Sequence, residues 1–257
     1  MRSGVHYFEL VLYMAYSELR VEATRAYLGF LWWFVEPVMY MAVFYLIFEA
    51  GLRSGGADYA PFLLCGLVAW KWFASTVLAA ANALGRNAGV MQQVYLPKLV
   101  FPLALTVSYT FKFAMIFILL LLYLTVVCGK PVSMAWAALP VLLLVQLAFV
   151  VAVSVLAASI VPFAPDLKLL LDNVMAMLFF VSGIFFDIDN MSEALQGVLR
   201  LNPVAVLIES YRAVLLHGAW PHWDRLAAIV AVSLLLLGAG MALFRRFDHV
   251  YPKLVSR

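Results

Sequence analysis

Long apolar runs separated by short polar segments dominate the pattern of the chain. Six of these runs are long enough to cross a hydrocarbon core of about 30 Å, which needs roughly 20 helical residues. The predicted spans cover residues 30–51, 60–83, 100–128, 135–161, 168–186 and 226–244. Backbone polar groups in lipid must be satisfied within their own segment, so we expect these spans to be helices. The pattern therefore predicts an all-α integral membrane protein with six transmembrane helices.

The distribution of Lys and Arg predicts the orientation of the spans. With the amino terminus inside, ten basic residues fall in cytoplasmic segments, against five in outer loops. The cytoplasmic set is Arg2, Arg20, Arg25, Arg86, Lys98, Lys168, Arg245, Arg246, Lys253 and Arg257. The outer set is Arg53, Lys130, Arg200, Arg212 and Arg225. The positive-inside rule therefore predicts a multi-pass protein with both termini in the cytoplasm.

The segment before the first span has the pattern of an amphipathic helix. Apolar residues recur every three or four positions, at Val5, Phe8, Leu12, Ala15, Leu19, Ala23 and Ala26. Charged residues of both signs occupy the other faces, so we expect a helix lying in the cytoplasmic membrane interface. Two interpretations stay open, a membrane anchor and a docking surface for a cytoplasmic partner.

The segment from Asp187 to Asp224 is too long for a hairpin and too apolar for a free loop. Met191 to Leu201 is predicted to form a short helix capped by Asn190. Asn202-Pro203 interrupts it, and Val204 to Leu216 is predicted to form a second helix, with the proline in its first turn. We expect a pair of short re-entrant outer helices between spans five and six.

Composition supports a membrane location and excludes several classes of protein. Of 257 residues, 66% are hydrophobic and 12% charged, and the mean hydropathy is +1.00. The net charge of +3 is spread along the chain, which argues against a nucleic-acid partner. Cys65 and Cys128 fit neither a disulfide framework nor a zinc site, and the four histidines form no metal-binding motif.

The apolar stretch Leu10 to Tyr16 is short and flanked by acidic residues, so it is not expected to be a cleavable signal. We treat 1–257 as a single transmembrane domain. It comprises an interface helix (1–28), spans one to five (30–186), outer helices (187–225), span six (226–244) and a cytoplasmic tail (245–257).

Five short stretches, in order along the chain, form a family pattern. They are Arg25-Ala26-Tyr27-Leu28-Gly29-Phe30-Leu31-Trp32 with Glu36-Pro37, Gly66-Leu67-Val68-Ala69-Trp70 with Phe73, Leu96-Pro97-Lys98 with Phe101-Pro102, Asp166 with Lys168, and Leu201-Asn202-Pro203 with Arg212. On this six-span background they resemble the ABC-2 family of transporter permeases, in its polysaccharide-exporting branch of the Wzm and KpsM type. The resemblance covers residues 19 to 244. Two departures are Pro165, where such exporters often have Arg, and Lys71, in a neighbourhood that is commonly aromatic.

The resemblance implies a homodimer joined to two ABC ATPase subunits, which exports a lipid-linked polysaccharide. The residues agree that the ATPase is a separate subunit, because a phosphate-binding loop needs G-x-x-x-x-G-K-[ST]. The Gly129-Lys130 pair has Leu124 at the first glycine position and Pro131 after the lysine. We therefore expect a transport subunit that is not itself an enzyme and binds no cofactor directly, with ATP and Mg²⁺ on the partner.

Aromatic and charged residues within the spans are the candidates for a substrate channel. Flat aromatic side chains suit the apolar faces of sugar rings, although aromatic belts at the membrane interface are the alternative. The candidates are Tyr40, Phe44, Trp70, Lys71, Phe73, Phe179 and Phe180. Lys71 is the candidate for contact with a diphosphate or acidic sugar. An ion pair between spans, for instance Lys112 with Asp172, is the structural alternative for intramembrane charges.

Two further sets of residues follow from the resemblance. Coupling to the ATPase is expected at Glu18, Arg25, Arg86, Leu96, Pro97, Lys98 and Asp166. An outer gate is expected at Asn202, Pro203 and Arg212.

Other functions remain open. An ABC-2 permease for a drug or a lipid would share this outline. A membrane glycosyl or acyl transferase would need paired carboxylates or a His-Asp motif at the membrane face. The D-x-D sequence Asp187-Ile188-Asp189 is predicted on the outer side, where no nucleotide sugar is available. A proton-coupled carrier would rest on Asp172 alone, without evident inverted repeats.

Overall fold

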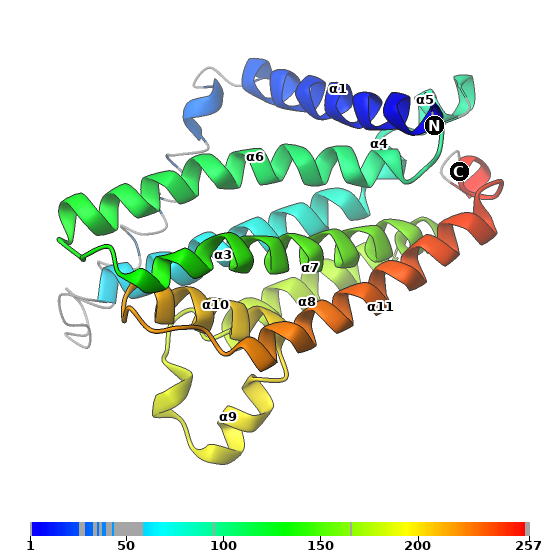
Figure 1. The fold of residues 1–257 in the computed structure, drawn as a ribbon. Coiled ribbons are helices and arrows are strands. Elements are labelled where there is room, and N and C mark those ends of the chain that lie inside the picture. The colour runs from blue at the N-terminus through cyan, green and yellow to red at the C-terminus, as the bar shows by residue number, and fades with distance from the viewer. Residues whose placement is uncertain are drawn as a thin grey trace.

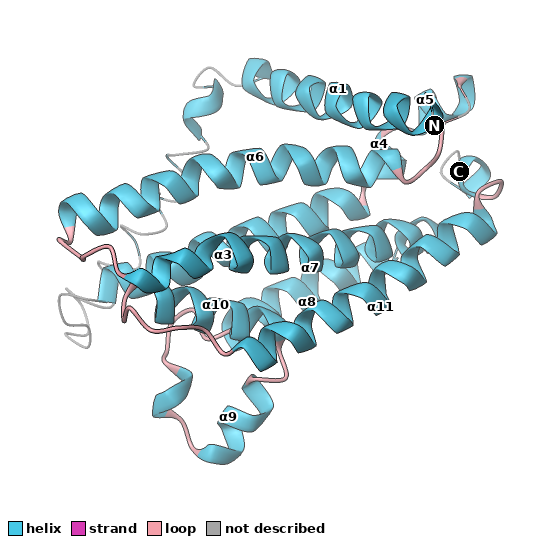
Figure 2. Cartoon of the chain, viewed as in Figure 1, coloured by secondary structure: helices cyan, strands magenta, loops and turns pink. Residues whose placement is uncertain are grey.

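The computed structural model describes residues 2–25, 29–32, 35, 38, 39, 43, 59–94, 96–164 and 166–254. These residues form helices and connecting loops, and no strand occurs among them (Figure 2). The longer helices are α1 (Arg2–Arg25), α3 (Tyr59–Ala81), α6 (Val100–Leu122), α7 (Leu139–Ile160), α8 (Asp166–Val181), α10 (Pro203–Leu215) and α11 (Trp223–Phe247). The shorter elements are η1 (Gly29–Leu31), α4 (Ala83–Arg86), α5 (Ala88–Gln93), η3 (Tyr123–Val127), η4 (Met134–Ala138), η5 (Val161–Phe163), η6 (Ile188–Asn190), α9 (Glu193–Leu199) and α12 (Tyr251–Leu254). The predicted all-α class is confirmed for the described chain.

Four helical segments of the described chain are long and apolar enough to cross a membrane. They are Tyr59–Ala81, Val100–Val127, Met134–Phe163 and Trp223–Phe247. Each begins and ends within about three residues of a predicted span, because the apolar runs themselves set the length of a membrane helix. The predicted first span, 30–51, lies almost wholly outside the described residues. The count of six spans therefore stays a prediction.

The helix predicted at 168–186 is shorter than expected. It is α8, which runs from Asp166 to Val181. At about 1.5 Å per residue this helix is about 24 Å long, less than a hydrocarbon core of about 30 Å. Gly183 follows with φ of +70°, a left-handed conformation that glycine adopts without a steric penalty and that stops helices. The prediction that this helix continues to residue 186 is wrong.

The core of the bundle lies around α3, which contacts α6, α7, α8 and α10. In the most apolar stretch of α3, 67% of residues are buried, against 22% for α11 at the periphery. Aromatic rings fill the space on two sides of α3. Trp72 stacks on Phe113 of α6 with 4.0 Å between ring centroids, and Phe73 stacks on Phe149 of α7 at 5.4 Å.

Helix α7 joins the central helix to the outer one. The buried Gln146 side chain of α7 donates a hydrogen bond of 2.9 Å to the carbonyl oxygen of Ala69 in α3. On its other side α7 meets α11 at Gly240, where an added Cβ would lie 3.0 Å from the backbone nitrogen of Leu156. Small residues allow such close approach between membrane helices. The backbone contact at Gly240 therefore sets the spacing of α7 and α11.

Helix α1 lies lengthwise along α6 (Figure 1). Val11 packs against Val100 and Ala104, and the Ser108 hydroxyl donates a hydrogen bond of 2.9 Å to the Ala15 carbonyl. This register means that the two helices run in the same direction. The buried face of α1 therefore contains Val11 and Ala15.

The apolar stripe predicted for α1 is only partly correct. Phe8 is 65% exposed and Leu12 is 43% exposed. The helix is apolar on two faces, of which one packs on α6 and the other remains exposed. Periodicity alone does not tell which of two apolar faces has a protein partner. A position of α1 in the membrane interface stays a prediction.

The two helices predicted after residue 187 are present as α9 and α10, with α9 projecting from the bundle (Figure 1). The predicted cap of the first is wrong. Asn190 ends η6, and the residue preceding α9 is Ser192. The interruption at Asn202-Pro203 is confirmed, because α10 begins at Pro203.

Candidate functional site

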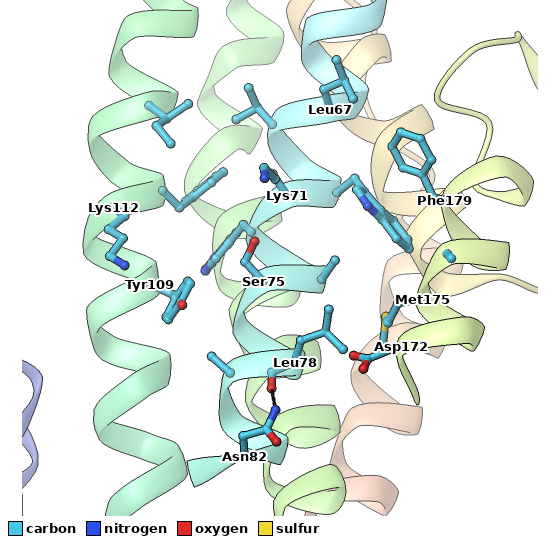
Figure 3. A pocket seen from close by; sticks show the side chains of 18 of the residues that line it. Leu67, Lys71, Ser75, Leu78, Asn82, Tyr109, Lys112, Asp172, Met175 and Phe179 are labelled. Atoms are coloured by element: carbon cyan, nitrogen blue, oxygen red, sulfur yellow. Dashed lines mark hydrogen bonds between the residues drawn. The ribbon is translucent and has the colours of Figure 1, made fainter. Parts of the chain in front are cut away.

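A cavity of about 980 Å³ lies in front of α3, between α6 and α8. Figure 3 shows Tyr109 and Lys112 of α6 on one side, Asp172 and Phe179 of α8 on the other, and Lys71 of α3 between them. Glu22 of α1 also lines it, so residues from four separate parts of the sequence meet at one space. This space is the strongest candidate for a substrate site in the described chain.

A polar stripe runs along the α3 wall of the cavity. Lys71, Ser75, Asn82 and Arg86 all line it, at intervals of four, seven and four residues. Such intervals place side chains on one face of a helix. The Asn82 side chain donates a hydrogen bond of 2.8 Å to the Leu78 carbonyl oxygen (Figure 3). The stripe leads from the middle of α3 to Arg86 at the end of α4.

The other end of the cavity is apolar and aromatic. Leu67 and Trp70 of α3 face Phe179 and Phe180 of α8 there. The Trp70 and Phe179 rings lie 5.8 Å apart between centroids. The Phe180 side chain is 64% exposed. The cavity thus offers flat apolar surface at one end and polar groups at the other, as an amphiphilic or glycan ligand requires.

Four basic and two acidic residues line the cavity. Lys112 forms an ion pair with Glu22 of α1, and its ammonium lies 4.1 Å from the centre of the Tyr109 ring. The ion pair suggested from the sequence was Lys112 with Asp172. The structure corrects it, because α1 brings Glu22 to the buried lysine, and the sequence gives no sign of this contact.

The structure separates the predicted channel residues into three groups. Trp70, Lys71, Phe179 and Phe180 all line the cavity. Phe73 is 3% exposed and packs against α7, so we assign it to the core. Tyr40 and Phe44 lie outside the described residues.

Lys98, predicted to contact an ATPase, is buried. Its side chain is 3% exposed, and its ammonium lies 3.7 Å from Asp248, which follows α11. A buried charge needs a partner of opposite sign, so this pair holds the 96–98 turn against the end of α11. Leu96 and Pro97 in the same turn are half-buried. The role of Lys98 in coupling to an ATPase stays a prediction.

The tail after α11 packs into the same end of the bundle. The Tyr251 hydroxyl donates a hydrogen bond of 2.9 Å to the Ser159 carbonyl oxygen, and its ring packs against Phe163 and Phe244. Burial and the nearby Asp248 carboxylate raise the pKa of Tyr251 to about 12. The hydroxyl therefore stays protonated and able to donate at physiological pH.

In contrast to the buried Lys98, most residues of α5 and the residue that follows it are exposed. Gly89, Val90, Gln92, Gln93 and Val94 are all exposed. This strip between α3 and α6 combines apolar and polar side chains, as the rim and centre of a protein interface do.

Three other predicted coupling residues lie at the ends of helices. Arg86 closes α4 and forms an ion pair with Glu18 of α1. Asp166 is exposed in the first turn of α8, where a carboxylate stabilises the helix dipole. Arg25 is the last residue of α1, and its side chain is outside the described part.

Asn202 and Pro203, predicted for an outer gate, build the start of α10. The Asn202 side chain accepts a hydrogen bond of 3.0 Å from the Val204 amide and donates one of 2.9 Å to the Ser182 hydroxyl. The first contact caps α10, and the second ties it to the turn after α8. Pro203 occupies the first helical position, where its missing N–H costs nothing.

Arg212, the third predicted gate residue, is 5% exposed and joins three segments. Its guanidinium donates hydrogen bonds to the carbonyl oxygens of Phe62 at 3.1 Å, Gly183 at 2.7 Å and Ile184 at 2.8 Å. It also lies 3.3 Å from the centre of the Phe62 ring. Arg212 therefore fixes α10 to the start of α3 and to the end of α8.

The sequence did not predict a second charged cluster, which is centred on Glu209 of α10. Arg200 lies 3.1 Å from the Glu209 carboxylate and also pairs with Asp189, while Arg225 lies 3.6 Å from Glu209. The hydrogen bond from Arg200 to Glu209 raises the pKa of Arg200, and both carboxylates add to the rise. The charges were visible in the sequence, but their pairing depends on how α9 folds back on α10.

The described residues contain no group of three or more His, Cys, Asp or Glu side chains that could hold a metal ion. Cys65 and Cys128 are free thiols, of which Cys65 is buried.

Comparison with known proteins gives a consistent result. The family model described as "ABC-2 type transporter" matches residues 9–216. Among similar proteins, the O-antigen export system permease protein RfbA of Myxococcus xanthus is 28% identical over 246 residues, covering 95% of this chain and 94% of the relative. A Klebsiella pneumoniae protein of the same name is 23% identical over 249 residues, covering 96% and 95%. The polysialic acid transport protein KpsM of Escherichia coli is 23% identical over 238 residues, covering 89% of each chain.

Proposed function

Since this chain belongs to the ABC-2 type transporter family, we propose that it is the transmembrane permease subunit of an ATP-driven exporter. Its substrate is a lipid-linked polysaccharide of the O-antigen or capsule type, which it moves from the cytoplasm across the inner membrane. The names of the relatives support this substrate class, because they describe O-antigen export and polysialic acid transport.

The cavity between α3, α6 and α8 is the observation that carries this proposal. Its volume of about 980 Å³ exceeds what side-chain packing leaves in a protein core. Charged side chains inside a membrane protein usually face a cavity or a pathway rather than lipid. Lys71 and Asp172 both line this cavity, next to the aromatic surface of Trp70 and Phe179. A path for an amphiphilic glycan needs both kinds of surface.

The exposure of α8 supports a channel at the axis of a homodimer. Met175 is the buried residue of α8, whereas Asp172 and Asn173 are exposed in the single chain. Polar groups facing lipid are costly, so a water-filled path or a second copy of this chain would cover them. A two-fold axis is the commonest symmetry of homo-oligomers and would double the lining of the path.

Two ABC ATPase subunits would supply the energy from the cytoplasmic side. The exposed α5 strip, from Gly89 to Val94, is the surface that we assign to this contact, together with Asp166. The two chain ends lie at the same end of the bundle as α5, which supports a cytoplasmic location for both termini (Figure 1).

Two alternatives make different predictions. An ABC-2 permease for a drug or a lipid would share the fold and the cavity, so only the cargo separates it from the proposed function. The contacts of Asp187 and Asp189, the candidate catalytic acids, argue against a membrane transferase. Asp187 accepts a hydrogen bond of 3.1 Å from the Asp189 amide, and Asp189 pairs with Arg200. Both acids therefore serve the outer loop.

Depletion of the chain in its native cell tests the proposal. We expect long lipid-linked glycan to be made and to collect on the cytoplasmic side, measured by surface labelling against total extracted glycan. Unchanged surface glycan would overturn the polysaccharide assignment and leave a permease for a smaller cargo. Lys71→Met should reduce export, whereas Lys130→Met, in the loop after η3, should not.

A further inference from the structure

Two cations at the polar end of the cavity are paired with carboxylates from a single helix. Arg86 forms an ion pair with Glu18, and Lys112 forms one with Glu22. Both carboxylates belong to α1, whereas the cations belong to α4 and α6. Arg86, Lys112 and Glu22 all line the cavity. The charge of α1 therefore reaches into the candidate substrate site.

The two halves of α1 are held differently. Its first half packs through Val11 and Ala15 against α6. Beyond Ala15, Glu18 and Glu22 form ion pairs with Arg86 and Lys112 of the bundle. Apolar packing does not respond to an ion, but an ion pair does. Any anion that binds Arg86 and Lys112 would therefore compete with the second half of α1.

Exposure indicates which member of the Lys112–Glu22 pair is exchangeable. The Lys112 side chain is 9% exposed, while that of Glu22 is 49% exposed. A buried ammonium requires a counter-charge, whereas a half-exposed carboxylate can return to water at little cost. Lys112 is thus a fixed cation that accepts one of several anions.

We propose that Arg86 and Lys112 form an anion site for which a phosphate-bearing head group competes with Glu18 and Glu22 of α1. Phosphate fits this pair better than a single carboxylate does. It presents several oxygens to the planar Arg86 guanidinium and carries enough charge to satisfy both cations. The two cations belong to separate helices, and their partners Glu18 and Glu22 are four residues apart on one face of α1, a spacing that a diphosphate could bridge.

The ligand class follows from the whole cavity. The polar stripe that ends at Arg86 continues past Lys71 to the aromatic surface at Trp70 and Phe179. A molecule with a phosphate at one end and an apolar or glycosyl portion at the other would match both regions. The inference rests on the proposed function for the source of this ligand, a lipid-linked glycan, and it adds the site at which the head group binds.

The competition links the cavity to the exposed end of the bundle. Arg86 closes α4, and α5 begins at Ala88 two residues later. When a head group replaces Glu18 on Arg86, the second half of α1 is released from the segment that leads to α5. Ligand binding in the cavity would thus change how α1 contacts the segment next to α5, the surface that we assign to the ATPase.

Equilibrium binding to the full chain tests the proposal. The chain would be placed in nanodiscs of neutral phosphatidylcholine and titrated with radiolabelled geranylgeranyl diphosphate. Removing a charge-assisted contact should make Lys112→Gln bind at least ~10-fold more weakly, whereas Glu22→Gln, which removes the competitor, should bind ~3-fold to 10-fold more tightly. Glu193→Gln makes the same change in charge on α9, outside the cavity, and should bind like the unmodified chain.

The opposite signs of these effects make the test decisive. Equal or weaker binding by Glu22→Gln overturns the competition, and equal binding of geranylgeraniol overturns the phosphate requirement. Hydrogen exchange gives a second readout that does not depend on a variant. Amides near Glu18 and Glu22 should exchange faster with the probe present, and unchanged exchange contradicts the release of α1.

Competing lipids separate the two sources of phosphate. If phosphatidylglycerol in the disc displaces the probe at equal concentration, the site belongs to the head groups of membrane phospholipids. If it does not, the site selects the isoprenyl diphosphate. Binding requires neither the ATPase nor transport. The variants could therefore bind the probe as expected while depletion of the chain leaves surface glycan unchanged. That combination would overturn the proposed function but support the anion site.

Discussion

The Arg212 site at α10 and the cavity use charge in opposite ways. At α10 Arg212 is enclosed, and its hydrogen bonds go to backbone carbonyl oxygens of two distant segments. At the cavity Lys112 is equally buried, but its counter-charge is the half-exposed Glu22 on a helix at the edge of the bundle. A carbonyl oxygen cannot leave without unfolding its segment, whereas a side-chain carboxylate can. Burial alone thus does not distinguish a structural charge from a functional one.

Arg212→Met should have the largest effect on stability. Methionine keeps the apolar stem but donates no hydrogen bond, so the carbonyl oxygens of Phe62, Gly183 and Ile184 lose their donor. Unsatisfied buried acceptors should lower the free energy of unfolding by about 3 to 5 kcal/mol. Titration with SDS in mixed micelles, followed by tryptophan fluorescence, measures the change.

Arg225→Met is the matched control. The Arg225 side chain is 29% exposed, and its guanidinium lies 3.6 Å from Glu209. Its loss should cost less than about 1 kcal/mol, as for exposed ion pairs. Similar losses for the two variants would contradict the structural role that we give to Arg212.

Gly66→Ala tests how tightly the Arg212 site is built. An added Cβ at Gly66 would lie 2.8 Å from a terminal guanidinium nitrogen of Arg212 and 3.4 Å from the Ile184 backbone. The arginine would have to move away from its carbonyl partners, which should cost about 1 to 3 kcal/mol. Gly85→Ala is the control, because nothing lies within 4 Å of a Cβ there. The same SDS titration should show little change for this control.

The residues that the sequence placed correctly are those whose structure depends on local rules. The bounds of four long helices follow from apolar runs and their Gly and Pro breaks. Asn202-Pro203 starts α10 as its residue types predict, since both effects act within one helical turn. The cavity-lining Trp70, Lys71, Phe179 and Phe180 were also singled out from the sequence, because intramembrane charge and aromatic residues are distinctive.

The contacts that were not predicted join distant residues. Lys98 pairs with Asp248, which is 150 positions later. Lys112 pairs with Glu22, not with Asp172, because α1 runs along α6. Neither partner follows from spacing, since a single sequence does not state which helices are neighbours. The predicted apolar stripe of α1 was only partly correct for the same reason. Two faces of this helix are apolar, and the position of α6 determines which one is buried.

Asn202→Ala should have an intermediate effect. It removes the cap on the Val204 amide and the hydrogen bond to Ser182, which together should contribute about 1 to 2 kcal/mol. Asn190→Ala provides the comparison, because Asn190 was the predicted cap of α9 but ends η6 and is exposed. If Asn190→Ala lowered the free energy of unfolding as much as Asn202→Ala does, the predicted capping role of Asn190 would be supported after all.

Glu18→Gln should have the smallest effect on stability. It tests whether the ion pairs between α1 and the cavity can exchange their partners. The Arg86 side chain is 47% exposed and that of Glu18 is 27% exposed, so water can replace either partner. The free energy of unfolding should fall by less than about 1 kcal/mol, as for other exposed pairs. The difference from the unmodified chain should vanish near 1 M salt, where the screening length is about 3 Å. A loss of several kcal/mol that persists in high salt would mean that α1 is a fixed part of the bundle, and the contrast between the cavity and the Arg212 site would fail.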